Sequence, residues 1–438
     1  MDGRKRPERL ARARSGWEEL ARRAVVRSLG PPPGPVHLNL PFREPLVPSG
    51  AEAALASGSA AGAHASGADD PLPPPRAPSD AEVEALRDAL SLERGAIVAG
   101  SLRSPCLPAL GFAERRGWPL LAEPTSGLRL PGALAAGTLL LADPAFSKAH
   151  VPRVVVQLGA APTSRAGLAF VAGAERLVIV DPDGLVADPS LHAELRLQAD
   201  PTSLLQALEP DLPPAGASSW LEGWRRADDL ARRAVDGLLD SWDEPYEGRI
   251  ARDLAAGVSD GSTLVVGSSM PVRDLDAYMT PRDGVRVLAN RGASGIDGFV
   301  STVLGVSVAE KPTFALCGDL TLLHDAGSLL WSARRGYHAV FVVPNNDGGG
   351  IFPLLAQRDL PELETLFVTP HGLDLARITD AAGAGYERAD RAVDVVPAVE
   401  RAAAAGGVAI VEVPVDRDRN VARHAETAAA VAAALERT

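Results

Sequence analysis

The stretch from Pro312 to Phe352 constrains the fold more than any other part of the chain. It contains an apolar run, Thr313 to Cys317, followed by Gly318-Asp319, an amphipathic segment, and a second apolar run, Ala339 to Val343, followed by Asn345-Asn346. Short apolar runs joined by a helical segment predict two parallel strands of a βαβ unit. Because loops that follow parallel strands share the carboxyl edge of the sheet, we expect Asp319 and Asn346 to lie close together.

The residue types at this edge predict a metal and diphosphate site. An Asp carboxylate and an Asn amide oxygen are hard oxygen donors of the kind that Mg²⁺ prefers. The glycines Gly348, Gly349 and Gly350 let the backbone turn sharply and approach a ligand closely. The alternative interpretation is that Gly-Asp and Asn-Asn are ordinary turn sequences.

Three strings in this region resemble a known family. Gly-Asp followed by Asn-Asn after a βαβ-sized gap is similar to the diphosphate-binding signature of thiamine-diphosphate enzymes. Three segments resemble the 2-succinyl-5-enolpyruvyl-6-hydroxy-3-cyclohexene-1-carboxylate synthase family of menaquinone biosynthesis: GDLTLLHD, NNDGGGIF and, upstream, NRGASGIDG. The resemblance runs from about Trp17 to the C-terminus and implies a thiamine-diphosphate-dependent transferase of the α/β class, with a parallel-sheet central domain and a parallel-sheet diphosphate-binding domain.

The resemblance also implies which residues bind the cofactor. Asp319, Asn346 and the backbone carbonyl of Gly348 would hold Mg²⁺, or Mn²⁺ in its place. Ile351, Phe352 and Leu355 would wall the thiazolium ring, although by spacing alone they could equally be core residues at a helix start. The cofactor-binding positions implied by the family are Ser269, Gly318, Asp319, Leu320, Asn346, Ile351, Phe352 and Leu355.

The substrate residues follow from the same comparison. Arg273 and Arg291 each follow a strand and a loop of small residues, and a guanidinium there suits bidentate recognition of a carboxylate. The resemblance implies that they bind 2-oxoglutarate and isochorismate, with Ser268 lining the same pocket and Arg165 at its mouth. A solvated surface Arg is the alternative for each. Another thiamine-diphosphate 2-keto acid decarboxylase or ligase, or a non-catalytic diphosphate-binding half that needs a partner chain, are the alternative functions.

The chain divides by composition. We expect residues 49–80, rich in Ala, Ser, Gly and Pro, to be a linker, and residues 213–240 to be a second linker and a helix. Between them, residues 81–212 alternate apolar runs with helical patterns, which predicts a central α/β domain. Residues 241–438 would form the cofactor domain. The apolar runs expected as strands of the central domain are Ala96 to Ala99, Leu120 to Ala122, Leu139 to Ala142, Val154 to Leu158 and Leu177 to Val180.

Residues 1–48 predict a helix, Trp17 to Leu29, and a strand, Val36 to Leu40, which cannot bury a core by themselves. They resemble the end of the family's pyrimidine-binding domain. That domain carries the glutamate that activates the cofactor, and no segment here matches its context, so we assign no catalytic residue.

The composition excludes several classes of protein. The net charge is −12, which disfavours a general binder of nucleic acid or anionic membranes. No apolar run is long enough to span a membrane, and only two cysteines occur, Cys106 and Cys317. We therefore expect a cytoplasmic protein, and the resemblance implies a homodimer or homotetramer.

Overall fold

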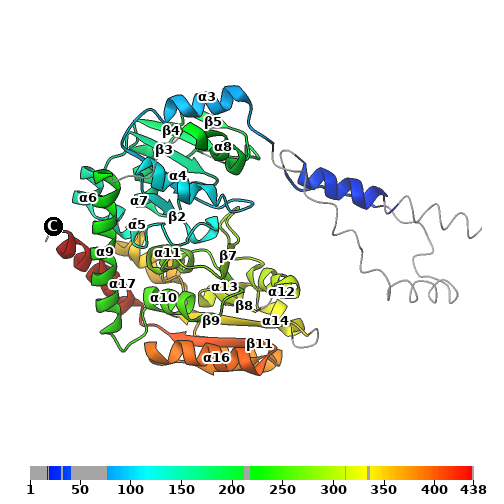
Figure 1. Ribbon diagram of the computed structural model, residues 1–438. Coiled ribbons are helices and arrows are strands. Elements are labelled where there is room, and N and C mark those ends of the chain that lie inside the picture. The colour runs from blue at the N-terminus through cyan, green and yellow to red at the C-terminus, as the bar shows by residue number, and fades with distance from the viewer. Residues whose placement is uncertain are drawn as a thin grey trace, which may run out of the picture.

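The computed structural model describes residues 17, 19–30, 33–40, 76–186, 188–211, 218–310, 312–332 and 336–436. Their strands form two sheets, and every strand pair in both sheets is parallel (Figure 1). Helices alternate with the strands along the chain. The predicted α/β class with two parallel sheets is therefore confirmed.

The first sheet has the strand order β2-β1-β3-β4-β5. Helices α3, α4 and α8 pack on one face, and α5, α6, α7 and α9 (Ser219–Asp240) pack on the other. Its strands are β1 (Gly95–Ala99), β2 (Leu120–Ala122), β3 (Val154–Leu158), β4 (Arg176–Val180) and β5 (Leu195–Leu197). Its helices are α3 (Asp80–Ala89), α4 (Pro108–Arg116), η2 (Pro124–Ser126), α5 (Gly137–Ala142), α6 (Pro144–Ala149), α7 (Arg165–Ala172), α8 (Pro201–Leu208) and η3 (Glu209–Asp211).

The second sheet has the order β10-β11-β9-β8-β6-β7. Helices α10, α11 and α16 cover one face, and α12 to α15 cover the other. Its strands are β6 (Ser262–Val266), β7 (Val285–Ala289), β8 (Thr313–Leu316), β9 (Ala339–Asn345), β10 (Gly385–Arg388) and β11 (Val408–Pro414). The helices are α10 (Glu247–Gly257), α11 (Met270–Tyr278), α12 (Phe299–Ala309), α13 (Asp319–His324), α14 (Ala326–Ser332), η4 (Phe352–Leu354), η5 (Ala356–Asp359), η6 (Leu363–Val368), α15 (Leu375–Ala382), η7 (Ala392–Asp394) and α16 (Val395–Ala405).

Two long helices connect the sheets. Helix α9 (Ser219–Asp240) and the closing helix α17 (Arg417–Leu435) lie side by side along both layers (Figure 1). Trp224 of α9 and Val431 of α17 are buried in the core that lines the first sheet, together with Tyr246 and Tyr278 from the second half of the chain. This shared apolar core fixes the two sheets against each other.

The topology predicts where a ligand binds in the second sheet. The chain runs from β6 outward to β7 and then returns to the other side of β6 as β8. In parallel α/β sheets, such a reversal leaves a crevice at the carboxyl ends of the two strands. The loops that follow β6 and β8 begin at Gly267 and Cys317, so they flank this crevice.

Some sequence predictions are wrong. Leu139 to Ala142 belongs to the helix α5, where Leu140 and Leu141 are buried, because a short apolar run fits a buried helix turn as well as a strand. Val36 to Leu40 forms no strand and its apolar side chains are exposed, since no described strand lies beside it to accept its hydrogen bonds. The helix predicted before it is present over residues 19–29.

Of the predicted linkers, residues 49–75 and 213–217 lie outside the described residues, as do residues 1–16 and 41–48. The helix predicted within residues 213–240 is present as α9.

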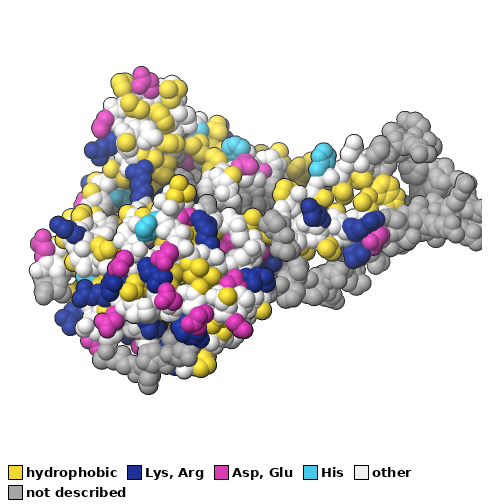
Figure 2. Space-filling view, turned by 90° about the horizontal axis from the view of Figure 1, so that it is seen from above, with side chains coloured by type: hydrophobic (Ala, Val, Ile, Leu, Met, Phe, Trp, Pro, Cys, Tyr) yellow, Lys and Arg dark blue, Asp and Glu magenta, His cyan; other side chains and the backbone are white. Residues whose placement is uncertain are grey.

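The surface carries mixed charge. Figure 2 shows acidic and basic side chains interspersed on the face drawn, and apolar side chains exposed along the projecting segment of residues 19–30 and 33–40. Among the described residues, no helix combines the length and the apolar character needed to cross a membrane. Cys106 and Cys317 are both buried and free.

Candidate active site

Asp319 lies at the carboxyl end of β8, as the first residue of α13, and is only 1% exposed. The backbone N–H groups of Leu320 and Gly348 donate to its carboxylate, at 2.6 Å and 2.9 Å. The Nε2 atom of His371 lies 3.3 Å from Oδ2. Burial raises the pKa of this carboxyl above its ordinary value, so the site favours a cation that would compensate the buried charge.

Asn346 directly follows β9 and lines the same cavity as Asp319. Its Nδ2 donates a 2.7 Å hydrogen bond to Oε1 of Glu247. Its Oδ1 is buried and has no hydrogen-bond partner in the described part of the chain. A buried acceptor without a partner is costly, and a divalent cation is a partner that it would suit.

The glycine run after Asn346 is required by its surroundings. Gly348 has φ +138°, and a Cβ atom there would overlap the carbonyl oxygen of Val368. Gly350 has no room for a Cβ because Asn346 lies against it. The chain can therefore bring the carbonyl and amide groups of residues 348–350 close to a bound ligand only with glycine at these positions.

These groups line one cavity of about 410 Å³. Among the described residues, no three His, Cys, Asp or Glu side chains are grouped so as to hold a metal. A cation here would therefore need the Asn346 amide and backbone carbonyls in addition to the Asp319 carboxylate. The cavity brings together twelve of the thirteen predicted positions: Ser268, Ser269, Arg273, Arg291, Gly318, Asp319, Leu320, Asn346, Gly348, Ile351, Phe352 and Leu355.

The apolar wall of the cavity is short and irregular. Ile351, Phe352 and Leu355 lie in and around the 3-10 turn η4, rather than in an α-helix, and none of them is fully buried. They line the cavity, which favours the interpretation as a pocket wall over that as helix-start core. Such a wall suits a flat heterocyclic ring.

The loop after β6 turns sharply into α11. Ser269 has φ +72°, which is unusual for a residue other than glycine, and its carbonyl accepts a 2.6 Å hydrogen bond from Arg273. Ser268 is buried, and its hydroxyl lies 3.4 Å from the carbonyl oxygen of Asn290. Strain of this kind is commonly found where a loop must present its backbone to a ligand.

Positive charge gathers on one side of the cavity. Burial lowers the pKa of Arg273, and the nearby charges of Arg291 and Arg165 lower it further. The guanidinium groups of Arg291 and Arg165 make no hydrogen bond or ion pair with any other described residue, and that of Arg273 bonds only to the carbonyl of Ser269. Arg165 is exposed and does not line the cavity itself. The grouping favours an anion with more than one carboxylate.

Known proteins match both halves of the chain. Residues 76–266 match the family described as the middle domain of thiamine pyrophosphate, and residues 273–413 match the C-terminal thiamine pyrophosphate binding domain of thiamine pyrophosphate enzymes. A 2-succinyl-5-enolpyruvyl-6-hydroxy-3-cyclohexene-1-carboxylate synthase of Thermobifida fusca is 40% identical over 98% of this chain and 75% of its own length. The chain belongs to this synthase family.

Other relatives with the same name agree. The synthase of Rubrobacter xylanophilus is 39% identical over 92% of this chain and 72% of its own length, and that of Myxococcus xanthus is 37% identical over 94% and 73%. The chain thus spans about three quarters of the length of these synthases. The family suggested by the three sequence strings is confirmed.

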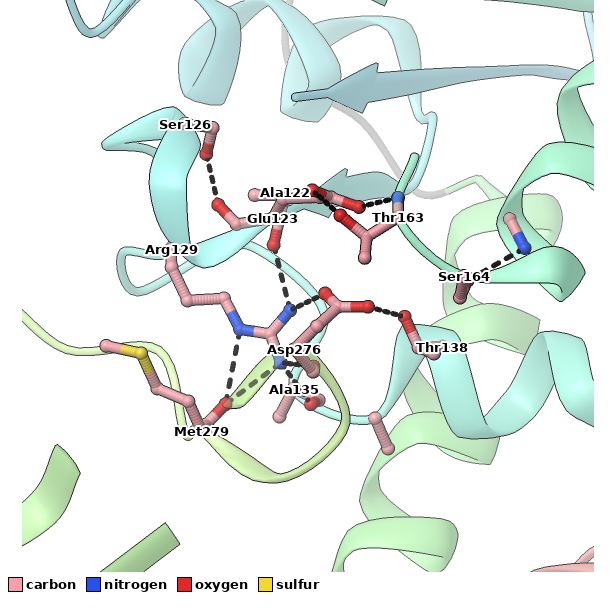
Figure 3. Close-up of polar contacts among 12 residues, drawn as sticks. Ala122, Glu123, Ser126, Arg129, Ala135, Thr138, Thr163, Ser164, Asp276 and Met279 are labelled. Atoms are coloured by element: carbon pink, nitrogen blue, oxygen red, sulfur yellow. Dashed lines mark hydrogen bonds and ion pairs between the residues drawn. The ribbon is translucent and has the colours of Figure 1, made fainter. Parts of the chain in front are cut away.

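In this chain, the first sheet places the carboxylate of Glu123 near enough to Arg273 and Arg291 for its charge to influence them. Its carboxylate accepts hydrogen bonds from the backbone and the hydroxyl of Thr163 (Figure 3), and Thr163 lies in the loop that leads to Arg165. Burial raises the pKa of Glu123 to about 7, and the charge of Asp276 adds to this effect. The neighbouring Arg129 bonds to the carbonyl oxygens of Asp276 and Met279, so this cluster fastens the two halves of the synthase to each other.

Sequence reasoning missed two residues of the site, Glu247 and His371. Glu247 is the first residue of α10 and is 5% exposed; burial raises its pKa to about 7. His371 lies in the loop after η6, and the N–H of Leu373 donates to its Nδ1, which leaves the proton on Nε2 to face Asp319. Neither residue directly follows a strand of the second sheet, so the pattern of polar residues at strand ends does not predict them.

Proposed function

We propose that this chain binds thiamine diphosphate with Mg²⁺ or Mn²⁺ and catalyses the decarboxylative addition of 2-oxoglutarate to isochorismate in menaquinone biosynthesis. The observation that carries the proposal is the unpartnered, buried Oδ1 of Asn346 beside Asp319 in a cavity with a cluster of arginines on one side. The name of the relatives supports the product, 2-succinyl-5-enolpyruvyl-6-hydroxy-3-cyclohexene-1-carboxylate.

Each group in the cavity has a part in this proposal. Asp319, Asn346 and the carbonyl of Gly348 would hold the cation, and Ser269, Gly318 and Leu320 would contact the diphosphate end of the cofactor. Ile351, Phe352 and Leu355 would hold the ring and exclude water. When bound, thiamine diphosphate supplies a thiazolium that accepts the electrons left as CO₂ departs from the 2-oxo acid.

Both substrates are dicarboxylates, which explains the arginines. Arg273 and Arg291 would each hold a carboxylate, with Ser268 beside them and Arg165 at the entrance. Their role is to orient the two substrates and to stabilise negative charge. A small neutral acceptor would not need such a cluster.

The proposal extends to assembly and location. We expect a homodimer or homotetramer, because α12 and α14 expose the apolar side chains of Val308, Leu330 and Trp331, and exposed apolar surface commonly marks association. A cytoplasmic location fits the two buried, free cysteines. Light scattering of the purified chain tests the assembly: a monomer at all concentrations would contradict it.

The activity is tested by turnover of the full chain with thiamine diphosphate, Mg²⁺, 2-oxoglutarate and isochorismate, with the product detected by mass spectrometry. We expect an adduct that requires both substrates. An adduct formed from pyruvate in place of 2-oxoglutarate would instead identify another thiamine-diphosphate ligase. Cofactor binding without any turnover would favour a non-catalytic diphosphate-binding half.

A further inference from the structure

The side-chain amide of Asn346 is held in one orientation. An amide presents an oxygen acceptor on one side and an NH₂ donor on the other, and the hydrogen-bond partners decide which side faces which way. Here Nδ2 faces Oε1 of Glu247 at 2.7 Å. The oxygen is therefore turned away from Glu247 and is left buried without a partner among the described residues.

Glu247 is itself fixed from two directions. It begins α10, and its backbone N–H donates to Oδ1 of Asn420 in α17, at 3.2 Å. Its carboxylate is buried and accepts the Nδ2 hydrogen bond of Asn346. No Lys or Arg forms an ion pair with Glu247 among the described residues. Its carboxylate thus acts as an acceptor for the amide of Asn346, rather than as half of a salt bridge.

The neighbouring residue, Asn345, forms a similar Asn–Glu pair outside the cavity and serves as a comparison. Asn345 donates from Nδ2 to Oε1 of the buried Glu412, also at 2.7 Å. In that pair, however, Oδ1 of Asn345 accepts a hydrogen bond from the backbone N–H of Asp347, at 3.2 Å. In both pairs the Asn Nδ2 atom donates to a Glu carboxylate. Only in the pair that lines the cavity, Asn346–Glu247, is the Asn Oδ1 atom left without a hydrogen-bond partner among the described residues.

We propose that Glu247 is a positioning residue for the metal site: it accepts the N–H of Asn346 and so keeps Oδ1 of Asn346 turned toward a divalent cation. This inference rests on the proposed function, because it assumes that the cavity takes a cation with the diphosphate. Because Nδ2 of Asn346 is the atom that bonds to the Glu247 oxygen, Oδ1 of the same amide points away from Glu247. Partners that orient a metal ligand in this way commonly account for about a 10- to 100-fold difference in metal affinity.

The test uses Glu247→Gln, which keeps the size of the side chain and introduces an NH₂ group that can bond to Oδ1 of Asn346. Mn²⁺ is titrated into the full chain in the presence of thiamine diphosphate, and free Mn²⁺ is followed by its paramagnetic resonance signal. We expect the dissociation constant of Mn²⁺ to rise by about 10- to 100-fold. Glu412→Gln is the matched control, and we expect it to leave this constant unchanged.

A rescue variant separates orientation from general damage. In the double variant Glu247→Gln with Asn346→Asp, both oxygens of residue 346 are acceptors, so the amide introduced at position 247 can donate to one while the other faces the cation. We expect the double variant to recover most of the lost Mn²⁺ affinity. If Glu247→Gln fails to fold by circular dichroism, the folded double variant alone, with near wild-type affinity, still supports the inference, and a double variant that binds no Mn²⁺ overturns it.

The outcomes also distinguish this inference from the proposed function. If the unaltered chain does not bind Mn²⁺ with thiamine diphosphate, the proposed function fails, and the inference fails with it. If the unaltered chain binds and Glu247→Gln binds equally well, only the inference is overturned. Equal losses in Glu247→Gln and Glu412→Gln would likewise overturn it, because a generic loss of a buried Asn–Glu pair would then explain both.

Discussion

Gly350 lies directly against the side chain of Asn346, so that a Cβ atom at position 350 would overlap Nδ2 of Asn346. That nitrogen cannot move freely, because it is hydrogen-bonded to Glu247. Position 350 must therefore be glycine to leave space for the Asn346 side chain. This requirement comes from the binding site, and not only from the backbone turn.

The first prediction concerns Gly350→Ala. The added methyl group should displace the amide of Asn346 and weaken Mg²⁺-dependent binding of thiamine diphosphate by about 10-fold or more. Calorimetric titration measures this effect. Gly305→Ala in α12 is the control, since a Cβ atom there meets nothing within 4 Å. Equal binding by the Gly350 variant and the unaltered chain would contradict the placement of Asn346 in the site.

The second prediction concerns the arginine cluster. Changing Arg273 or Arg291 to Ala removes a charge-assisted hydrogen bond to a substrate carboxylate, which is worth about 1.5–3 kcal/mol. We expect the dissociation constant for 2-oxoglutarate to rise by about 10- to 100-fold in either variant. Arg286→Ala on the neighbouring β7 is the control, because Arg286 is exposed and already paired with Glu310. Unchanged 2-oxoglutarate binding in both variants would rule out the proposed substrate class.

The strand ends could be predicted from the sequence because parallel topology leaves few choices. Thr313 to Cys317 and Ala339 to Val343 are apolar runs of strand length, and β8 and β9 do pair as neighbours. Once they pair, Asp319 and Asn346 must share an edge. The register of the pair, Leu316 opposite Val342, could not be read from the sequence, since it depends on the packing of both faces.

Other features had no local signal. The edge strand β10, Gly385–Arg388, carries polar residues and is partly exposed, so it lacks the apolar run that marks a buried strand. Glu247 is brought to Asn346 only by the packing of α10 against the second sheet. Contacts of this kind depend on the position and orientation in which helices pack on the sheet, which a sequence pattern does not specify.

The third prediction concerns the fastening of the two halves. The buried guanidinium of Arg129 bonds to the carbonyl oxygens of Ala122, Ala135, Asp276 and Met279 and lies 3.7 Å from the Asp276 carboxylate (Figure 3). Arg129→Leu would leave these groups buried without a partner, and we expect a loss of about 3–5 kcal/mol in the free energy of unfolding. Urea unfolding measures it.

The matched control for that prediction is Arg153→Ala, whose side chain is half-exposed and paired with an exposed Glu175. Solvent screens an exposed pair of this kind, so we expect Arg153→Ala to leave the free energy of unfolding nearly unchanged. A loss in the Arg129 variant no larger than in the Arg153 variant would show that the interface does not depend on the buried cluster.

The fourth prediction concerns pH. Burial lowers the pKa of His424 from its ordinary value of 6.5 to about 4, and its Nδ1 is hydrogen-bonded to the hydroxyl of Tyr246. Between about pH 4 and pH 6.5, the unfolded chain binds a proton at His424 and the folded chain does not. The contribution of neutral His424 to the free energy of unfolding is therefore fully present above about pH 6.5. It is lost as the pH falls toward 4, which lowers the free energy of unfolding by up to about 3 kcal/mol.

Unfolding by urea at several pH values checks this for the unaltered chain and for His424→Asn, which keeps an acceptor near Tyr246. The variant should show a flatter slope between these pH values. The neighbouring Asp274, whose pKa burial raises, acts in the opposite sense, because its stabilising contribution falls as the pH rises. An unchanged slope in the variant would show that His424 does not titrate in this window.

The central claim is that Asp319 and Asn346 hold a cation and, through it, the diphosphate of thiamine diphosphate. Its most direct test is calorimetric titration of the full chain with thiamine diphosphate, with and without Mg²⁺, beside an Asp319→Ala variant shown to be folded. The account predicts binding that needs both Mg²⁺ and Asp319. Binding that persists without Mg²⁺ or in the Asp319 variant, or no binding by the folded, unaltered chain, would contradict it.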